Sequence, residues 1–582
     1  MRHIIKLFLL LGIITNLFYS CTDNFFQRPV GGTTSVDSVF ASKINSEKAI
    51  ATAYAMCLRQ GLNVTGWDGN NTYGIAGGHV DNMSGCFGAP QSGMVADNGT
   101  GNVNNARSDD SYPFNFAAIR QCYIVIENID KVRDMTQQEK DMVKAEMKAL
   151  IAYRYTQMFT IYGGVPIVEK AFTSSENLGL KRENLTKTLD FIKRLCDEAA
   201  AVLPASWDAK WNGRVIRSAA LAIKAKAILF SARPLFNSAT PYLSFGENNN
   251  LICFNNFDKQ RWQDAVDANL AVVAQANADG IEIINTGNPL EDYSIATSTP
   301  GNKETIMVYK LQADPSYSGY MYAYYCISPG NPNGNRDPAT GNTRLTYFYL
   351  KQYKKANGTD QTWPESGLQP YSDYNTRMQE MEPRFKASFY AYGIDAWNNP
   401  GDNNWKSDKL FPKPSQRHDV IVINTKFYYK AGLRSWFEMP LFRLAANYLA
   451  LAEGYNELGD PTNALLYLNV IRNRAGMPNE TETDQAQLRD IIIREWAVEM
   501  YFEQVWFQSE KHWKLANIGT EIIGGPIKYF YINWNTASGM ASDFTDYKLF
   551  TAYQGYWNVR EFLSPIPQSE INKGFILQNP GY

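Results

Sequence analysis

Histidine is rare in this sequence and its cysteines are never closely paired. The 582 residues include four histidines and seven cysteines, with no Cys-x-x-Cys pair and no His-Glu-x-x-His motif. The zinc sites and zinc hydrolases that use those spacings therefore lack their ligands. No Gly-x-Ser-x-Gly elbow, phosphate-cradling loop or dinucleotide fingerprint occurs either. We expect no catalytic residues and no cofactor.

A surplus of basic residues is also absent. Lysine and arginine number 56 against 58 acidic residues, for a net charge of −2. Because proteins bind nucleic acid by neutralising its phosphates, we exclude nucleic acid as a partner. The alternating oxygen-bearing side chains of Asn331, Asn333, Asn335 and Asp337 suggest calcium ligands. Three of them are neutral and Arg336 lies among them, so we interpret this stretch as a solvated turn and expect no metal.

The N-terminal apolar run is too short to cross a bilayer, which takes ~20 residues. Arg2 and Lys6 precede this run, and Cys21 follows it. This order is typical of a secretory signal peptide, which we place at residues 1–20. Cys21 occupies the position of the acylated cysteine of a bacterial lipoprotein, and we predict that it is lipidated. An ordinary signal peptide followed by an unmodified cysteine is the alternative.

The remaining cysteines have wide and irregular spacing. They are Cys57, Cys86, Cys122, Cys196, Cys253 and Cys326. This spacing does not indicate a dense disulfide framework, and a chain of this length can bury a large core without one. We expect buried thiols, and an occasional disulfide remains open.

Helical patterns dominate both ends of the chain. Thr136 and Glu139 form a capping box that predicts a helix as far as residue 162. Ala145, Ala149 and Ala152 form a stripe of small residues on it, which lets another helix approach closely. The other predicted helices are 46–60, 116–134, 186–203, 216–232, 261–278, 441–458, 462–475 and 485–508. Paired helices with short turns predict a mostly α fold built on a tetratricopeptide-like scaffold of helical hairpins.

Glycine, asparagine and proline interrupt the helical pattern in two long stretches. The first, residues 61–115, is a loop region inserted in an N-terminal helical scaffold of residues 21–280. The second, residues 281–435, is a large irregular, loop-rich lobe. Residues 436–582 then supply C-terminal helices and a terminal segment, packed with the rest as one globular unit. Loops this long in a compact protein are often functional.

Four segments carry a resemblance to a known family. They are Cys21-Thr-Asp-Asn-Phe-Phe, the helix 145–155 with Ile161-Tyr-Gly-Gly-Val-Pro-Ile167, the helical pair 440–459 and 468–476, and Leu563-Ser-Pro-Ile-Pro with Gln578-Asn-Pro-Gly-Tyr582. In this order they resemble the SusD-like (RagB/SusD) family over the whole chain. Gln504 and Trp506 depart from the family's usual glycine and arginine. Those positions are scaffold in the family, so the departures concern local packing.

The resemblance implies a lipoprotein of the outer membrane, anchored by Cys21 and facing the extracellular side. It would bind a nutrient, most often an oligosaccharide or other glycan, and deliver it to a SusC-like TonB-dependent transporter. It would not be an enzyme. A peptide-capturing RagB-type lipoprotein is the alternative. An envelope glycoside hydrolase and a purely scaffolding tetratricopeptide-like protein also remain open.

Ligand binding is expected on loops that combine aromatic faces with hydrogen-bonding side chains, since 35 tyrosines, 30 phenylalanines and 13 tryptophans leave rings available beyond the core. The predicted binding residues are Trp67, Asp68, Asn71, Tyr73, Asn104 and Arg107 in the first long stretch, and Tyr322, Trp363, Tyr374 and Trp397 in the second. We favour the first stretch, because the resemblance implies an aromatic binding residue in an early loop. Packing of each ring onto the scaffold is the alternative at every position.

Overall fold

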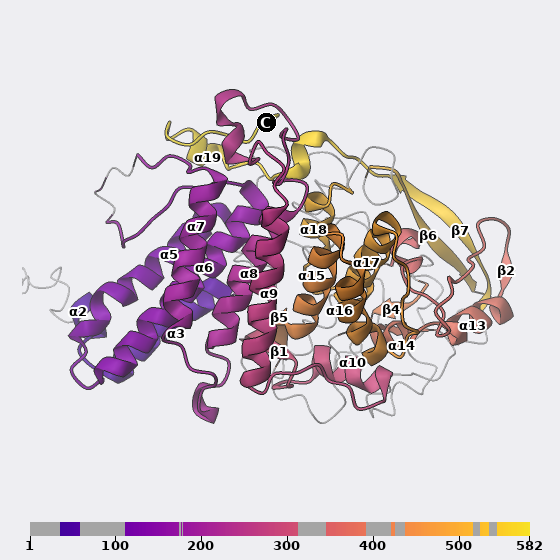
Figure 1. Ribbon diagram of the computed structural model, residues 1–582, viewed down its shortest axis with the longest axis horizontal. Coiled ribbons are helices and arrows are strands. Elements are labelled where there is room, and N and C mark those ends of the chain that lie inside the picture. The colour runs from indigo at the N-terminus through magenta and orange to yellow at the C-terminus, as the bar shows by residue number, and fades with distance from the viewer. Residues whose placement is uncertain are drawn as a thin grey trace, which may run out of the picture.

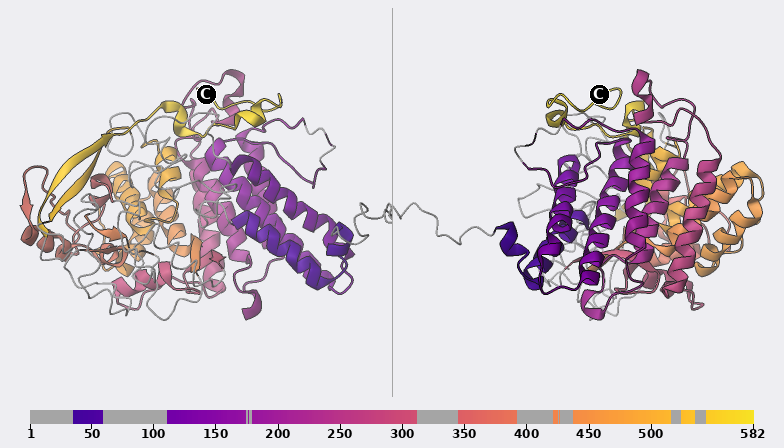
Figure 2. Two further views of the ribbon diagram at one scale, coloured as in Figure 1. Left: turned by 180° about the vertical axis from the view of Figure 1, so that it is seen from behind. Right: turned by 60° about the vertical axis from the view of Figure 1, so that its left-hand side comes forward.

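The computed structural model describes residues 35–58, 111–173, 176, 179–311, 345–391, 421–424, 426, 437–515, 524–534 and 544–582. Its first half consists of helices packed against one another (Figures 1 and 2), with short 3-10 segments between them. They are α2 (Val36–Val39), α3 (Lys43–Leu58), α5 (Ser111–Asn128), η3 (Ile129–Lys131), α6 (Gln137–Tyr162), α7 (Leu185–Ala200), η4 (Ala209–Trp211), α8 (Arg217–Ala232), η5 (Gly246–Leu251) and α9 (Gln260–Ala278).

The helices begin where local capping signals predict. Thr136 Oγ1 accepts a hydrogen bond from the Glu139 backbone N at 3.2 Å, and the Glu139 carboxylate accepts one from the Thr136 backbone N at 2.8 Å. The predicted capping box of α6 is therefore confirmed. Helix α16 (Pro461–Arg474) begins at Asp460, whose carboxylate accepts from the Asn463 backbone N at 3.0 Å.

Small residues bring neighbouring helices together. Ala145, Ala149 and Ala152 are buried on α6, which packs against α5, α7 and α8. Helix α8 packs on α9, and α9 packs on α15 (Leu444–Glu457). Helix α16 packs in turn on α15. The mostly α fold, with a scaffold of packed helical hairpins, is thus confirmed. Within the described residues, no helix has the length and hydropathy needed to cross a membrane.

The second half mixes short helices with three small antiparallel sheets. Strand β1 pairs with β5, β3 with β4, and β7 lies between β2 and β6. The elements of the second half, in chain order, are α10 (Pro289–Ser298), β1 (Thr305–Leu311), α12 (Tyr347–Leu350), β2 (Gln369–Pro370), α13 (Tyr371–Glu380), α14 (Pro383–Ser388), β3 (Phe389–Tyr390), β4 (Ile423–Asn424), β5 (Phe437–Arg443), α15, α16, α17 (Gln485–Glu499), α18 (Trp506–His512), β6 (Pro526–Trp534), β7 (Phe544–Gln554), η9 (Val559–Phe562) and α19 (Gln568–Ile571). The β6–β7 hairpin, seen in yellow, extends along one edge of the molecule (Figure 2).

Three sequence predictions need correction. The helix predicted at 485–508 is two helices, because α17 ends at Glu499 and α18 begins at Trp506. Between them Phe502 and Gln504 have φ values of 58° and 60°, which a helix does not allow. Helix α5 begins at Ser111, so the loop region predicted to extend to 115 ends earlier. The strands β6 and β7 were not predicted.

A buried ion cluster joins several elements of the second half. Arg443, at the end of β5, donates to Glu304 and Glu499 at 2.6 Å each. Arg474 of α16 pairs with the same two carboxylates. Arg384 of α14 also reaches Glu499, at 3.3 Å. Because breaking such a buried pair leaves an uncompensated charge, the cluster holds the elements that supply it in register.

The C-terminal segment closes over the end of α6. Arg182 donates hydrogen bonds to the carbonyl oxygens of Gly164 at 2.7 Å, Tyr162 at 2.8 Å and Leu577 at 3.0 Å. Asn579 also donates to the Tyr162 carbonyl, at 3.2 Å. The two sequence segments 161–167 and 578–582, far apart in the chain, therefore meet in the fold.

Candidate functional site

Most of the predicted ligand-binding residues lie outside the described residues, as do the signal peptide, Cys21 and the segment 331–337. The binding residues concerned are Trp67, Asp68, Asn71, Tyr73, Asn104, Arg107, Tyr322 and Trp397. Their role therefore stays a prediction. The structure describes the other two, Trp363 and Tyr374.

Trp363 and Tyr374 are packed in the core. Trp363 is 6% exposed and its ring lies against Phe530 of β6, with centroids 5.7 Å apart. Tyr374 is fully buried, lies against Phe544 of β7 at 4.8 Å, and donates its hydroxyl hydrogen to the Ile421 carbonyl at 2.9 Å. A sugar ring thus has no open aromatic face to stack on at either position.

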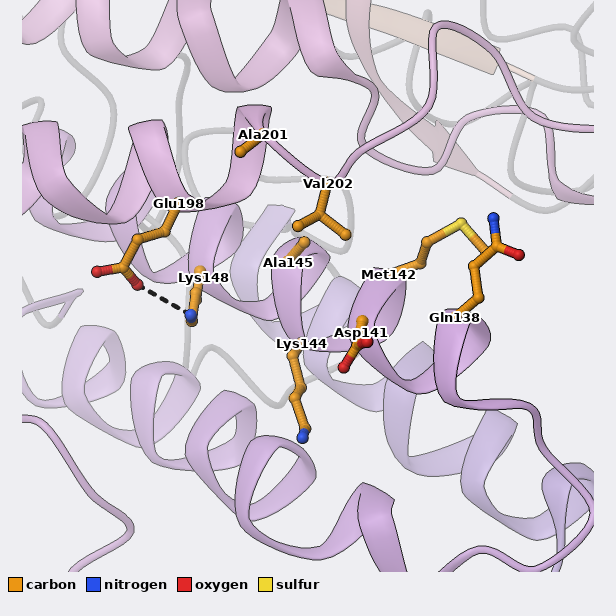
Figure 3. Close-up of a pocket in the computed structure, with 9 residues that line it drawn as sticks. All are labelled: Gln138, Asp141, Met142, Lys144, Ala145, Lys148, Glu198, Ala201 and Val202. Atoms are coloured by element: carbon orange, nitrogen blue, oxygen red, sulfur yellow. Dashed lines mark ion pairs between the residues drawn. The ribbon is translucent and has the colours of Figure 1, made fainter.

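One hollow in the described surface has little binding chemistry. It measures about 520 Å³ and lies between α6 and the end of α7 (Figure 3). Lys148 is paired with Glu198 at 2.9 Å across it, and Lys144 is paired with Asp130 at 2.7 Å. Ala145 and Val202 lie beside them, and no aromatic ring lines the hollow. With both lysines already paired, this hollow offers little to a ligand.

The second hollow, here named the Trp211 groove, combines aromatic and polar groups. Its volume is about 360 Å³, within the range of about 300–1,000 Å³ typical of small-molecule sites. It lies between helix α3, the turn from η4 to α8, and strand β1. Its lining residues are Glu47, Ile50, Ala51, Tyr54, Ala55, Leu58, Lys210, Trp211, Asn212, Gly213, Arg214, Val308, Tyr309 and Lys310.

A buried ion pair fixes the aromatic wall of the groove. Glu146 of α6 is fully buried and accepts two hydrogen bonds from Arg214, at 2.5 and 2.6 Å. The Arg214 guanidinium in turn lies 4.5 Å from the ring centroid of Trp207 and 5.1 Å from that of Trp211. Contacts of this kind between cations and rings are attractive. Because Glu146 fixes the Arg214 guanidinium, the guanidinium in turn holds the Trp211 ring in place.

Tyr54 extends the same network from α3. Its hydroxyl donates to Glu146 and accepts from the Val215 backbone N at 2.9 Å. Burial and the nearby Glu146 charge raise the pKa of Tyr54 well above its ordinary value. Burial also raises the pKa of Glu146, although Arg214 opposes this change. Three elements, α3, α6 and the turn before α8, thus meet at one hydrogen-bonded centre beneath the groove.

The polar rim of the groove comes from η4 and β1. Lys210 places its ammonium 4.5 Å from the Trp211 ring centroid. Lys310 of β1 pairs with Glu438 at 2.7 Å, and its stem crosses Gly213 so closely that a Cβ there would lie 2.6 Å from Lys310 Cε. Gly213 also has a φ of +101°, which side-chain-bearing residues rarely adopt. The turn that presents Trp211 therefore requires glycine.

The groove was not predicted, although the sequence contains a signal for it. Trp207 and Trp211 stand four residues apart in the short connection between two predicted helices, beside Lys210 and Arg214. This is the same combination of rings and polar groups that was sought in the long loops. Nothing in the sequence, however, reveals that α3 and β1 complete the walls. Within the described residues, no group of three or more His, Cys, Asp or Glu side chains is placed to hold a metal ion.

The chain is similar in sequence to known protein families. A model described as the SusD family matches residues 303–582, and a model described as starch-binding associating with outer membrane matches residues 35–229. A SusD-like protein, P25, of Formosa agariphila is 21% identical over 477 residues, which is 79% of this chain and 76% of the relative.

Solved structures share the fold. A SusD-like protein of Bacteroides fragilis superposes with a TM-score of 0.73 at 22% identity, covering 94% of this chain and 98% of its own. A surface glycan-binding protein A of Bacteroides fluxus gives a TM-score of 0.60 at 15% identity, with coverage of 93% and 100%. At these identities the structures establish the fold alone. The two family models leave only residues 1–34 and 230–302 of the chain unmatched. The chain belongs to the SusD-like family.

Proposed function

We propose that this chain binds a glycan at the cell surface and delivers it to a SusC-like TonB-dependent transporter, without reacting with it. Membership of the SusD-like family supports the proposal, as do the description of the second matching family as starch-binding and the name of the Bacteroides fluxus protein of the same fold. The predicted signal peptide and lipidated Cys21 agree with a place at the outer membrane.

The Trp211 groove is the observation that carries glycan binding. Sugar rings have apolar C–H faces and polar edges, so they bind where an aromatic ring lies among hydrogen-bonding groups. The groove provides Trp211 and Tyr309 together with Glu47, Asn212 and Lys210. Helix α3 ends at Leu58 on the groove wall, and the chain continues from there into the stretch that holds Trp67 and Asn71. The role of those two residues in ligand binding stays a prediction.

The expected affinity is modest. One or two stacked rings contribute ~0.5–1.5 kcal/mol each, and each of a few hydrogen bonds contributes about 1 kcal/mol net. Such a total corresponds to dissociation constants between about micromolar and millimolar. Weak binding suits a protein that must release its ligand to a transporter.

Substitution of Trp211 tests the placement. In calorimetric titration with a glycan that the wild type binds, Trp211→Ala should weaken affinity about tenfold, equivalent to ~1.4 kcal/mol, and Trp67→Ala should weaken it too. Phe257→Ala is the matched control, because Phe257 is an exposed ring (62%) that does not line the groove, and its affinity should equal that of the wild type. Unchanged affinity in Trp211→Ala would remove the groove from the site. Binding of peptides in place of glycans would favour the RagB-type alternative.

Delivery requires a partner in the outer membrane. A tagged full-length chain, extracted from its native membrane in mild detergent, should co-purify a protein of TonB-dependent transporter size. A Cys21→Ala variant should be lost from the membrane fraction, because its lipid anchor is missing. Recovery of the wild-type lipoprotein alone would contradict a stable complex.

A further inference from the structure

Two buried cysteines touch where α3 meets α5. The Sγ atoms of Cys57 and Cys122 lie 3.5 Å apart, and both residues are fully buried. Cys57 lies in the last turn of α3, and Cys122 lies within α5, which packs against α3. The other two described cysteines, Cys196 and Cys253, are also buried, but neither has another cysteine of the described residues at this distance.

The surroundings of the pair favour thiolate chemistry at one sulfur. Burial alone would raise the pKa of the Cys57 thiol, but the hydrogen bond with Cys122 and the charge of Arg154 outweigh it and leave this pKa below its ordinary value. Burial and the neighbouring Cys57 raise the pKa of Cys122 well above its ordinary value. The thiolate is the nucleophile in thiol–disulfide exchange. In the folded protein, Cys57 therefore has more thiolate character than Cys122.

We propose that Cys57 and Cys122 form a disulfide bond in the mature protein. The sulfurs are already in contact, and closing their separation to the ~2.05 Å of a disulfide needs only a small change of side-chain rotation. The oxidant is the disulfide of an envelope thiol oxidase. Cys57 attacks it to form a mixed disulfide, and Cys122 then attacks Cys57 Sγ. The oxidant leaves as a dithiol that keeps both electrons and both protons. Because the sulfurs are sealed in the fold, this exchange takes place while the chain folds.

The bond would close the chain around residues 58–121. This segment includes residues 59–110 and thus most of the predicted binding residues, and it begins at Leu58 on the wall of the Trp211 groove. A cross-link across a long loop lowers the entropy of the unfolded chain. It also fixes both ends of the segment to the scaffold. The inference rests on the part of the proposed function that places the chain in the cell envelope, and it does not depend on which ligand is bound.

Thiol mapping of the full chain tests the disulfide. The protein is isolated from the bacterial envelope, unfolded without reductant, alkylated and digested for mass spectrometry. The peptides that contain Cys57 and Cys122 should be found joined, two hydrogen masses lighter than their sum, while Cys196 and Cys253 should be alkylated. Full alkylation of both Cys57 and Cys122 would overturn the proposal.

A paired variant gives a second readout. Reduction under unfolding conditions, followed by refolding in reductant, should lower the thermal midpoint of the wild type. The same treatment should leave the Cys57→Ala/Cys122→Ala double variant unchanged, and Cys196→Ala should behave as the wild type does. Equal sensitivity of the wild type and the double variant to reductant would contradict the disulfide. If the double variant fails to fold, the thiol map of the wild type still decides.

Discussion

Glu499 is the carboxylate of the ion cluster that lies among three arginines. It is fully buried, and it meets Arg384, Arg443 and Arg474. Burial alone would raise the pKa of the Glu499 carboxyl, but the three arginine charges outweigh it and hold the pKa well below its ordinary value. A carboxylate whose folded-state pKa is depressed stabilises the fold above its unfolded pKa, and this contribution is lost as the pH falls below that value.

At pH 7, Glu499→Gln should therefore strongly lower the urea concentration at the midpoint of unfolding. Removing one partner of a buried pair costs roughly 3–5 kcal/mol, and the difference from the wild type should shrink as the pH falls below the ordinary carboxyl range. The control is Glu282→Gln, which breaks the exposed pair of Glu282 with Lys303 and should leave the midpoint unchanged. Equal midpoints for Glu499→Gln and the wild type at pH 7 would contradict this description of the cluster.

The sequence does not reveal whether a single aromatic residue is exposed or buried. Trp363 and Trp211 both stand among polar, loop-forming residues, and local composition treats them alike. Phe530, which covers Trp363, is far away in the chain and belongs to a hairpin that the sequence did not predict. Trp211 instead lines a hollow whose other walls come from α3 and β1. Exposure of a ring is thus decided by distant segments.

At the element scale, Gly163 constrains the link from α6 to the following loop. Gly163 has a φ of +82°, and a Cβ there would lie 2.4 Å from the Leu251 carbonyl oxygen. Gly280, after α9, has nearly the same φ, +77°, but has no atom within 4 Å of an added Cβ. Gly163 thus combines a restricted backbone conformation with a steric constraint, while Gly280 has a positive φ and open space around it.

Gly163→Ala should destabilise the protein more than Gly280→Ala does. Both substitutions carry the cost of a positive φ, on the order of 1–3 kcal/mol, and the cost is greater at Gly163, whose ψ of −138° is rare for residues other than glycine. Gly163→Ala also adds an overpacking cost of about 1–3 kcal/mol. Urea unfolding of the two variants beside the wild type measures the difference. Equal losses would show that Leu251 yields without cost and that the contact does not constrain the turn.

Helix starts could be predicted from the sequence because their signals are local. The capping box at Thr136 and the Asp460 cap each lie within four residues of the helix that they begin. The split of the helix predicted at 485–508 could not be predicted, since the turn after Glu499 brings Glu503 to the buried charges of Arg443 and Lys426. Strand β6 was missed because Tyr529 and Phe530 are both buried; adjacent apolar residues on both faces hide the alternation of a strand.

The whole molecule joins packed helices in its first half to a second half of short helices and small sheets. The ion cluster ties β5, α14, α16 and α17 of the second half together, and α9 packs on α15 across the boundary between the halves. The C-terminal segment, tied by Arg182 and Asn579, closes the end of α6. The Trp211 groove lies where α3 of the first half meets β1 of the second half. A site placed between packed elements holds its ligand groups in fixed positions, which favours binding without large conformational cost.

The central claim is that this chain holds a glycan and leaves it intact. The most direct test is a calorimetric titration of the purified mature protein with a panel of oligosaccharides, followed by chromatography of the recovered ligand. The account predicts binding of at least one oligosaccharide with a dissociation constant between about micromolar and millimolar, and recovery of that ligand at its original length. Shortened oligosaccharides, or no binding by any member of a broad glycan panel, would contradict it.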